Sequence, residues 1–456
     1  MIAKSFLFTL LSSGLFFGFN FFIAKVIGAY EYGRIIYDLS FLQITVILIS
    51  FNYAALYMGH RITDKDQQTF SLFFTTETLW FTILALPLYW GISYYIEDTA
   101  IVGLILVIAY FNTIVNSASL EYNALSDIVT SIKLNAFYPR VITILLFLIF
   151  IYFGNKNVES YFTAMLTAYS IIFVYVLRYL KPTLYLKQKI FIRLWKFYLL
   201  GILGSVFVHI ARIMQKEYGS YEQVATLGVV LLIFAGFGLI NSVLVKFVLP
   251  KMHQLFREKK IKEIGKLYTN NTFLVFVSIV PMMTFLLFNI QDFASFFGNG
   301  YEMLPLFFYI VLIGYLTDIV TGITGNILRT TGYEHFEIFN EIMRMIVGVS
   351  AIYIFKSYPY GIALALSIST LVYNALKYIE VYTLFHFVPF TKRYIKKLSF
   401  FIVYFTIIFS ASQSIDSVWV RYIIQVCGLG IGYYMIYQYI IQNKELISGY
   451  KNVSDH

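Results

Sequence analysis

Long apolar stretches, each of about 20 residues, recur from one end of the chain to the other, with short polar connections between them. A helix of about this length crosses the hydrocarbon core of a bilayer and satisfies all its backbone polar groups within one segment. An outer-membrane barrel would instead show alternating segments of about ten residues. We therefore expect an all-α polytopic membrane protein with about 14 transmembrane helices. The expected helices are 5–27, 35–59, 70–96, 99–120, 131–153, 158–179, 195–214, 223–247, 270–290, 303–325, 335–355, 360–383, 398–415 and 418–441.

The composition agrees with this interpretation and excludes a sizeable water-soluble domain. Hydrophobic residues fill 59% of the 456 positions, charged residues fill 13%, and the mean hydropathy is +0.74. A soluble domain carries about 25% charged residues. The first apolar run, 5–27, is too long for a signal peptide and lacks an A-x-A-like cleavage site, so we expect it to be the first membrane helix.

The distribution of basic residues predicts the orientation. About 25 of the 34 Lys and Arg residues fall on the side of the membrane that would hold both termini. Such an excess is typical of cytoplasmic connections, so we expect both termini in the cytoplasm. The same excess accounts for the net charge of +10, so we expect no nucleic-acid partner. The single Cys427 makes neither an intrachain disulfide nor a thiolate metal site, and we expect no metal and no cofactor. The largest basic clusters on that side are 178–196, 246–266 and 377–397.

Two basic connections contain regularly spaced apolar residues. They are 181–196 and 251–266. Each is consistent with a short interfacial helix against anionic lipid, and equally with an ordinary cytoplasmic loop.

A weak internal repeat relates basic residues in the two halves of the chain. Lys25 and Arg212 hold the same place in expected helices 1 and 7, and each is followed by an aromatic, glycine-containing turn. Arg140 and Arg344 lie at similar depths in expected helices 5 and 11. Six helices per repeat make the repeats parallel, an architecture in which transporters commonly bind substrate between the repeats.

This repeat predicts the domain organisation. We expect two pseudo-symmetric six-helix lobes, an N-lobe at 1–180 with helices 1–6 and a C-lobe at 181–385 with helices 7–12. Two additional transmembrane helices and a short cytoplasmic tail follow at 386–456.

Three segments resemble a known family. They are the turn 28–33 (GAYEYG) after the opening helix, 326–332 (NILRTTG) and 360–365 (YGIALA). These segments are similar to those of the bacterial polysaccharide-biosynthesis and O-antigen flippases, which handle lipid-linked oligosaccharides and belong to the multidrug/oligosaccharidyl-lipid/polysaccharide exporter (MOP) superfamily. The resemblance implies two lobes in a V, alternating access, and a central cavity near helices 1, 2, 7 and 8.

The resemblance also implies a cargo and a location. The cargo would be an undecaprenyl-pyrophosphate-linked oligosaccharide repeat unit for O-antigen, capsule or another surface polysaccharide. The chain would lie in the bacterial inner membrane, with membrane lipids and other polysaccharide-assembly membrane proteins as candidate partners.

Basic side chains within helices are the candidate substrate-binding residues, because the pyrophosphate is anionic. An arginine at the bilayer centre costs about 2.5–3.5 kcal/mol, so Arg140 and Arg344 should face the lobe interface or be paired. Glu341 stands three residues before Arg344, and a structural ion pair is the alternative there. Lys25 and Arg212 are further candidates, with snorkelling to the headgroups as the alternative. His209 shares a helix face with Arg212, and its alternative is ordinary packing.

Two acidic residues within helices are candidate coupling carboxylates. Glu77 and Asp318 lack a basic neighbour in sequence, so they are candidates to bind a proton or a cation during transport. They keep open a second function, a multidrug or cation antiporter of the same superfamily.

No enzyme motif is present in the sequence. We find no Walker A, no H-E-x-x-H and no G-x-S-x-G pattern, so we expect no enzyme. A membrane glycan polymerase or ligase is the remaining alternative, and it disagrees with the short outer connections, of which the longest is 291–302.

Overall fold

The computed structural model describes residues 2–50, 57, 61, 68–125, 127–186, 189–443 and 446. Within these ranges the regular structure is helical and contains no strand. Eleven of the described helices are long and apolar enough to cross a membrane. The helical class is therefore confirmed, whereas the number 14 stays a prediction. Two long helices, α8 (Lys189–Glu217) and α16 (Val418–Gln442), are not among the eleven.

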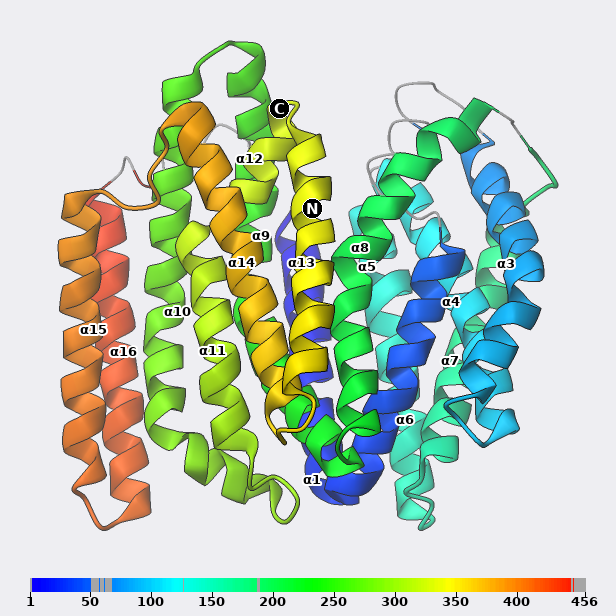
Figure 1. Cartoon of the computed structure of the whole chain (residues 1–456), viewed down its shortest axis with the longest axis horizontal. Helices are drawn as coiled ribbons and strands as arrows, with labels where there is room; N and C mark the ends of the chain where they lie inside the picture. The colour runs from blue at the N-terminus through cyan, green and yellow to red at the C-terminus, as the bar shows by residue number, and fades with distance from the viewer. Residues whose placement is uncertain are drawn as a thin grey trace. The chain divides into compact units, whose positions relative to one another are not determined.

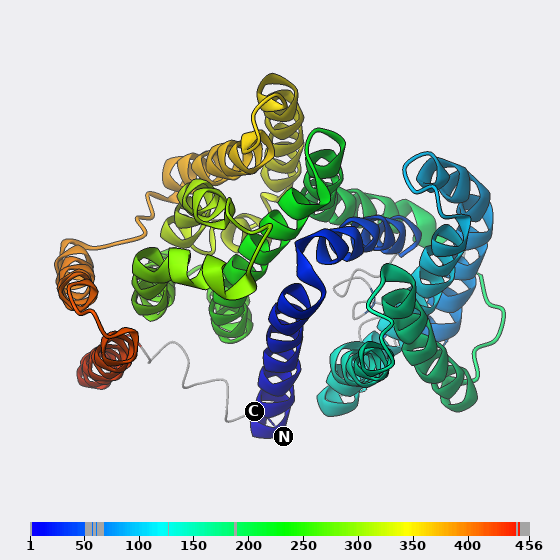
Figure 2. The same ribbon diagram turned by 90° about the horizontal axis from the view of Figure 1, so that it is seen from below.

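The first helix contains a sharp break at one residue. Helix α1 (Ile2–Ile49) consists of two helices joined by a kink at Gly28, where the backbone is non-helical with a φ of 83° and a ψ of 169°. Figure 2 shows the two parts of α1 running in different directions from this point. A side chain would be strained at this positive φ, which favours glycine. The expected helices 5–27 and 35–59 are thus separated by a single residue instead of a loop over 28–34.

The chain divides into two compact units, Met1–Gly228 and Val229–His456. In the first unit, α4 packs against α3 and α7, α7 packs against α6, and α8 packs against α1. The remaining helices of the first unit, with their bounds, are α3 (Thr69–Ser93), α4 (Thr99–Ala124), α5 (Ile128–Ile132), the π-helix η2 (Lys133–Phe137), α6 (Tyr138–Tyr152), α7 (Val158–Leu180) and the first part of α9 (Tyr221–Arg257).

In the second unit, α14 packs against α11 and α13, while α15 and α16 form a hairpin that packs against α10 (Figure 1). The helices of this unit that follow α9 are α10 (Ile261–Phe297), α11 (Leu304–Thr321), α12 (Thr324–Thr330), α13 (Glu334–Phe355), α14 (Gly361–Phe385), α15 (Lys392–Gln413) and α16. A cluster of buried aromatic and aliphatic side chains, including Phe273, Phe401 and Phe405, fills the space between α10, α15 and α16.

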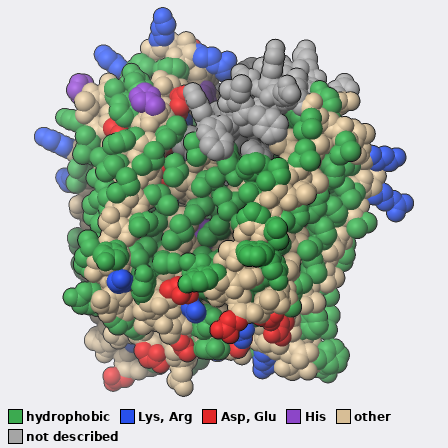
Figure 3. Space-filling model, turned by 45° about the vertical axis from the view of Figure 1, so that its right-hand side comes forward, with side chains coloured by type: hydrophobic (Ala, Val, Ile, Leu, Met, Phe, Trp, Pro, Cys, Tyr) green, Lys and Arg blue, Asp and Glu red, His purple; other side chains and the backbone are tan. Residues whose placement is uncertain are grey.

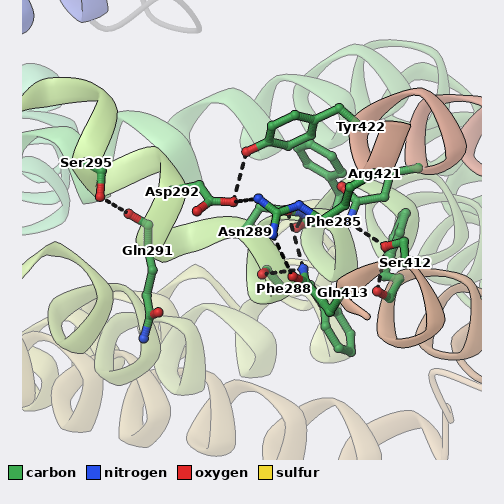
Figure 4. A network of polar contacts seen from close by, with 12 residues as sticks. Phe285, Phe288, Asn289, Gln291, Asp292, Ser295, Ser412, Gln413, Arg421 and Tyr422 are labelled. Carbon is green, nitrogen blue, oxygen red and sulfur yellow. Dashed lines mark hydrogen bonds and ion pairs between the residues drawn. The ribbon is translucent and has the colours of Figure 1, made fainter. Parts of the chain in front are cut away.

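A polar network attaches the C-terminal hairpin to α10 (Figure 4). Arg421 of α16 pairs with Asp292 of α10 at 2.6 Å, and the Tyr422 hydroxyl donates to the same carboxylate at 3.0 Å. Gln413 of α15 donates to the Phe288 carbonyl at 2.9 Å. These bonds supplement the apolar contacts at one end of the hairpin.

The two basic connections do not form separate helices within the described residues. Residues 181–186 are non-helical, and α8 begins at Lys189 and continues into the next expected span. The segment 251–266 instead forms the end of α9 and the beginning of α10, joined by a turn in which Lys259 has a positive φ.

The outer surface is rich in apolar side chains. Hydrophobic side chains cover much of the face in Figure 3, and most acidic side chains on this face lie near its lower end. Fully solvated proteins rarely expose such large apolar patches, whereas lipid contact explains them.

Candidate functional site

Arg140 lies in the first unit and is held by neutral partners. Its Nη1 donates to the Ser12 carbonyl at 3.2 Å and to the Ser12 hydroxyl at 2.9 Å. The guanidinium also lies 4.7 Å from the centre of the Phe16 ring. Among the described residues, Arg140 makes no ion pair with a carboxylate.

The helix that carries Arg140 begins irregularly. The π-helix η2 precedes α6, and Pro139 occupies its first turn. Short π-helical turns occur frequently at functional sites because they shift the side chains that follow. The sequence predicted one regular helix over 131–153, so this irregularity is new information.

Arg212 of α8 is the second candidate arginine in the first unit. It is half-buried, and its Nε is buried without a hydrogen-bond partner among the described residues. His209, one turn earlier, has a buried Nδ1 that is likewise unpartnered there. His209 and Arg212 interact electrostatically, which agrees with their expected position on one face of the helix.

Three buried tyrosines lie within electrostatic range of the two arginines. Tyr32 interacts electrostatically with both Arg212 and Tyr161. Tyr161 in turn interacts with Arg140 and Tyr169. We call Arg140, Arg212, Tyr32, Tyr161 and Tyr169 the cation–tyrosine cluster. It combines two positive charges with phenol hydroxyls, a set of donors suited to an anionic, oxygen-rich group.

Lys25 differs from its expected equivalent Arg212. Lys25 is exposed on α1, three residues before the break at Gly28, whereas Arg212 is half-buried. The environments of the two residues are therefore unequal. The exposure agrees with the snorkelling alternative for Lys25.

Arg344 of α13 makes the ion pair that its sequence spacing suggested. Its Nη2 lies 2.9 Å from Glu341 Oε2, and its guanidinium is 4.9 Å from the centre of the Tyr373 ring. The Tyr373 hydroxyl lies within hydrogen-bond distance of two carboxylates, 2.7 Å from Glu341 and 3.0 Å from Glu337. Arg329 pairs with Glu337 at 2.8 Å. Arg344 thus belongs to a paired network, unlike Arg140.

Asp318 lies within electrostatic range of a buried lysine, Lys377. Asp318 is half-buried on α11 and interacts electrostatically with Lys377 of α14. The charge distribution assigned Lys377 to the cytoplasmic cluster 377–397. Lys377 is 6% exposed and lies within α14, in agreement with the expected helix 360–383.

Glu77 is fully buried on α3, with an exposure of 0%. The Ser117 hydroxyl of α4 lies 3.0 and 2.8 Å from its two carboxylate oxygens. A second buried carboxylate, Glu121, was not singled out from the sequence. It binds Arg61 at 2.7 Å and the Tyr57 hydroxyl at 2.9 Å.

Metal ligation has no evident site in the described part of the chain. No group of three or more His, Cys, Asp or Glu side chains there is arranged to hold a metal ion.

Comparison with known proteins gives matches only among solved structures. No protein-family model and no curated protein matches the chain. A structure described as "Lipid II flippase MurJ, inward closed conformation" matches with a TM-score of 0.68 and 16% identity, over 97% of this chain and 100% of that chain. An inward-facing multidrug resistance MATE family transporter of the MOP superfamily matches with a TM-score of 0.63 and 13% identity, over 80% and 94%.

The chain has the fold of MOP superfamily transporters. A further match, a MOP superfamily transporter from Pyrococcus furiosus, has a TM-score of 0.50 and 13% identity over 84% of this chain and 93% of that chain. Its description connects a reversed polarity of the binding pocket with a different function. All three similar structures are transporters or flippases, and with the eleven apolar helices they support a multi-pass membrane protein.

Proposed function

We propose that this protein flips polyprenyl-pyrophosphate-linked oligosaccharide repeat units across the bacterial inner membrane, for O-antigen, capsule or another surface polysaccharide. The observation that carries the proposal is the cation–tyrosine cluster. Its two arginines have no carboxylate partner among the described residues, and the fold is similar to that of a lipid II flippase.

The energetics of buried charge favour an anionic cargo. An arginine near the bilayer centre costs about 2.5–3.5 kcal/mol in the absence of a counter-ion, and Arg140 lies in the middle of a candidate membrane span. Arg140 donates to the neutral carbonyl and hydroxyl of Ser12 in this structure. The charged oxygens of a pyrophosphate accept stronger hydrogen bonds than these neutral groups. The phenol hydroxyls of the cluster are suited to phosphate or sugar oxygens.

The proposed mechanism is alternating access by two lobes. In this proposal, the chain has about 14 membrane helices in total. Six form the lobe 1–180, six form the lobe 181–385, and two follow. Both termini lie in the cytoplasm. Lys25, Arg140, His209, Arg212 and Arg344 contribute to the cavity. The membrane potential helps an anion outward by about 2.3 kcal/mol per charge per 100 mV.

A multidrug or cation antiporter is the second candidate function. The fully buried Glu77 favours it, because a carboxylate in a membrane helix is suited to a cation or a proton. The MATE transporter among the similar structures has the same fold. The first function is preferred because the two cations of the cation–tyrosine cluster would repel a cationic drug.

The proposal is tested by surface-glycan display in a strain that depends on this gene. Arg140→Ala and Arg212→Ala should each lower display about tenfold or more, because each removes a charged hydrogen bond to phosphate. Arg257→Ala, at an exposed position at the end of α9, is the matched control and should leave display unchanged. Normal display from both cluster variants, at normal protein abundance, would exclude the cationic mechanism.

A further inference from the structure

Six aromatic side chains form a continuous series of ring contacts within the first unit. They come from α1, from the start of α9 and from the connection between α3 and α4. Successive ring centres lie between 5.1 and 5.7 Å apart. We call this series the aromatic chain, and its members in order of contact are Tyr30, Tyr221, Tyr37, Phe41, Tyr95 and Tyr94.

The two ends of the aromatic chain are exposed, whereas its middle is buried. Tyr37 is 1% exposed, while Tyr30 is 51% and Tyr94 is 84% exposed. The buried rings fix the exposed ones in place. Exposed rings held in this way present flat apolar faces, which are suited to the C–H groups of a sugar.

Carboxylates surround the aromatic chain. The segments that carry its rings, 30–41, 94–98 and 215–222, contain six Asp and Glu residues but only two Lys and Arg residues. One of the carboxylates, Glu217, is exposed and accepts a hydrogen bond from the Tyr37 hydroxyl at 3.1 Å. Ionised carboxylates accept strong hydrogen bonds from hydroxyl groups, which sugars carry in large number.

Asp38 is a buried carboxylate in this group, with an exposed fraction of 5%. Arg34 attracts its charge but pairs with Glu31 at 3.6 Å. Asp38 interacts electrostatically with Tyr37 and Tyr221 of the aromatic chain, yet it accepts no hydrogen bond from any residue that the structure describes. A buried carboxylate without a donor is stabilised by a ligand that supplies one.

The aromatic chain lies next to the cation–tyrosine cluster along α8. Arg212 of the cluster stands four residues before Lys216, so the two side chains share a face of α8 and lie about 6 Å apart along its axis. The Lys216 Nζ is 5.5 Å from the centre of the Tyr37 ring and 5.9 Å from that of Tyr221. A ligand in which sugars follow a phosphate can therefore contact both groups at once.

We propose that the aromatic chain binds the sugar part of the cargo and favours a glycan without acidic sugars. This rests on the proposed function, in which the pyrophosphate binds the cation–tyrosine cluster. Sugar C–H groups pack on the exposed rings, and sugar hydroxyls donate to the carboxylates. A uronic acid or a phosphate on the glycan meets an excess of carboxylates and is repelled.

An aromatic belt at the membrane interface is the alternative explanation for exposed tyrosines, and it requires no sugar. Tyr152 of α6 provides the matched control. It is 85% exposed and its ring contacts that of Phe153 at 5.4 Å, just as Tyr94 is 84% exposed and contacts Tyr95 at 5.1 Å. The connection 153–157 contains no carboxylate, whereas 94–98 contains two. Belt residues would behave alike, and the proposal requires them to differ.

The test is saturation-transfer NMR with the purified full-length chain in detergent. The probe is the free repeat-unit oligosaccharide, released from the surface polysaccharide of a strain that depends on this gene, without lipid or pyrophosphate. We expect transfer to the sugar C–H protons with the wild type, and a signal about threefold lower or less in Tyr94→Ala. Tyr94→Phe, which keeps the ring, and Tyr152→Ala should both give the wild-type signal. Electrophoresis of the oligosaccharide should show no net negative charge.

Three results would overturn the proposal: equal signals from the wild type and Tyr94→Ala, equal losses in Tyr94→Ala and Tyr152→Ala, or an acidic repeat unit. Glycan display separates this proposal from the proposed function. No sugar signal from the wild type, together with lost display in Arg140→Ala and Arg212→Ala, overturns the sugar site alone. Normal display in both arginine variants overturns the proposed function instead.

Discussion

Arg140 and Arg344 hold similar places in the expected repeat, yet their charges are balanced differently. Arg344 has Glu341 one turn away and forms an ion pair of 2.9 Å. Arg140 contacts the Ser12 carbonyl and hydroxyl and the Phe16 ring. A paired arginine gains less from an arriving anion than an unpaired one, so we assign the larger role in binding to Arg140.

Breaking the Arg344 pair should destabilise the protein. Glu341→Gln removes the negative charge while the half-buried Arg344 keeps its own, and we expect about 3 kcal/mol of lost stability. The measurement is thermal unfolding of the purified chain. Glu334→Gln, at an exposed position in the first turn of the same helix, is the control and should unfold like the wild type. Equal unfolding of Glu341→Gln would show that the pair contributes nothing.

Only part of these residue environments could be predicted from the sequence. The spacing of Glu341 and Arg344 on one helix was sufficient to suggest their pair. The contact of Arg140 with Ser12 spans 128 residues, and no local pattern encodes it.

The helix boundaries predicted from the sequence agree with the structure where apolar runs have polar ends. They differ where a single residue with a non-helical conformation interrupts a helix. The expected helix 303–325 is divided at Gly322, which has a φ of 64° and separates α11 from α12. At Gly28 the turn between two expected helices is one residue long. Neither backbone conformation changes the hydropathy pattern, so neither was visible in it.

The hairpin of α15 and α16 should loosen when its polar attachment is removed. Arg421 is the donor that binds Asp292 at 2.6 Å and Gln413 at 3.2 Å. We expect Arg421→Met to speed amide hydrogen exchange in the hairpin about fivefold, a loss of about 1 kcal/mol in local stability.

A neighbouring acidic residue provides the control for the hairpin. Asp416 is exposed in the connection between α15 and α16, and Asp416→Asn should leave the exchange unchanged. If Arg421→Met also exchanges like the wild type, the apolar packing against α10 holds the hairpin alone.

At the scale of the whole molecule, the fold admits more than one cargo. The similar structures include a lipid II flippase and multidrug transporters at 13–16% identity, so the fold alone does not choose between them. The choice rests on the charges within the spans. Two arginines without described carboxylate partners favour an anion, while the buried Glu77 is compatible with a coupling proton.

The most direct measurement is flipping by the purified protein in proteoliposomes. A fluorescent undecaprenyl-pyrophosphate oligosaccharide is placed in the bilayer, and its appearance in the opposite leaflet is followed beside the uptake of a cationic dye. We predict flipping by the wild type, loss of flipping in the Arg140→Ala/Arg212→Ala double variant, and no dye uptake by either. Dye uptake without flipping, or equal flipping by the double variant, would contradict the assignment of an anionic lipid-linked cargo to the cation–tyrosine cluster.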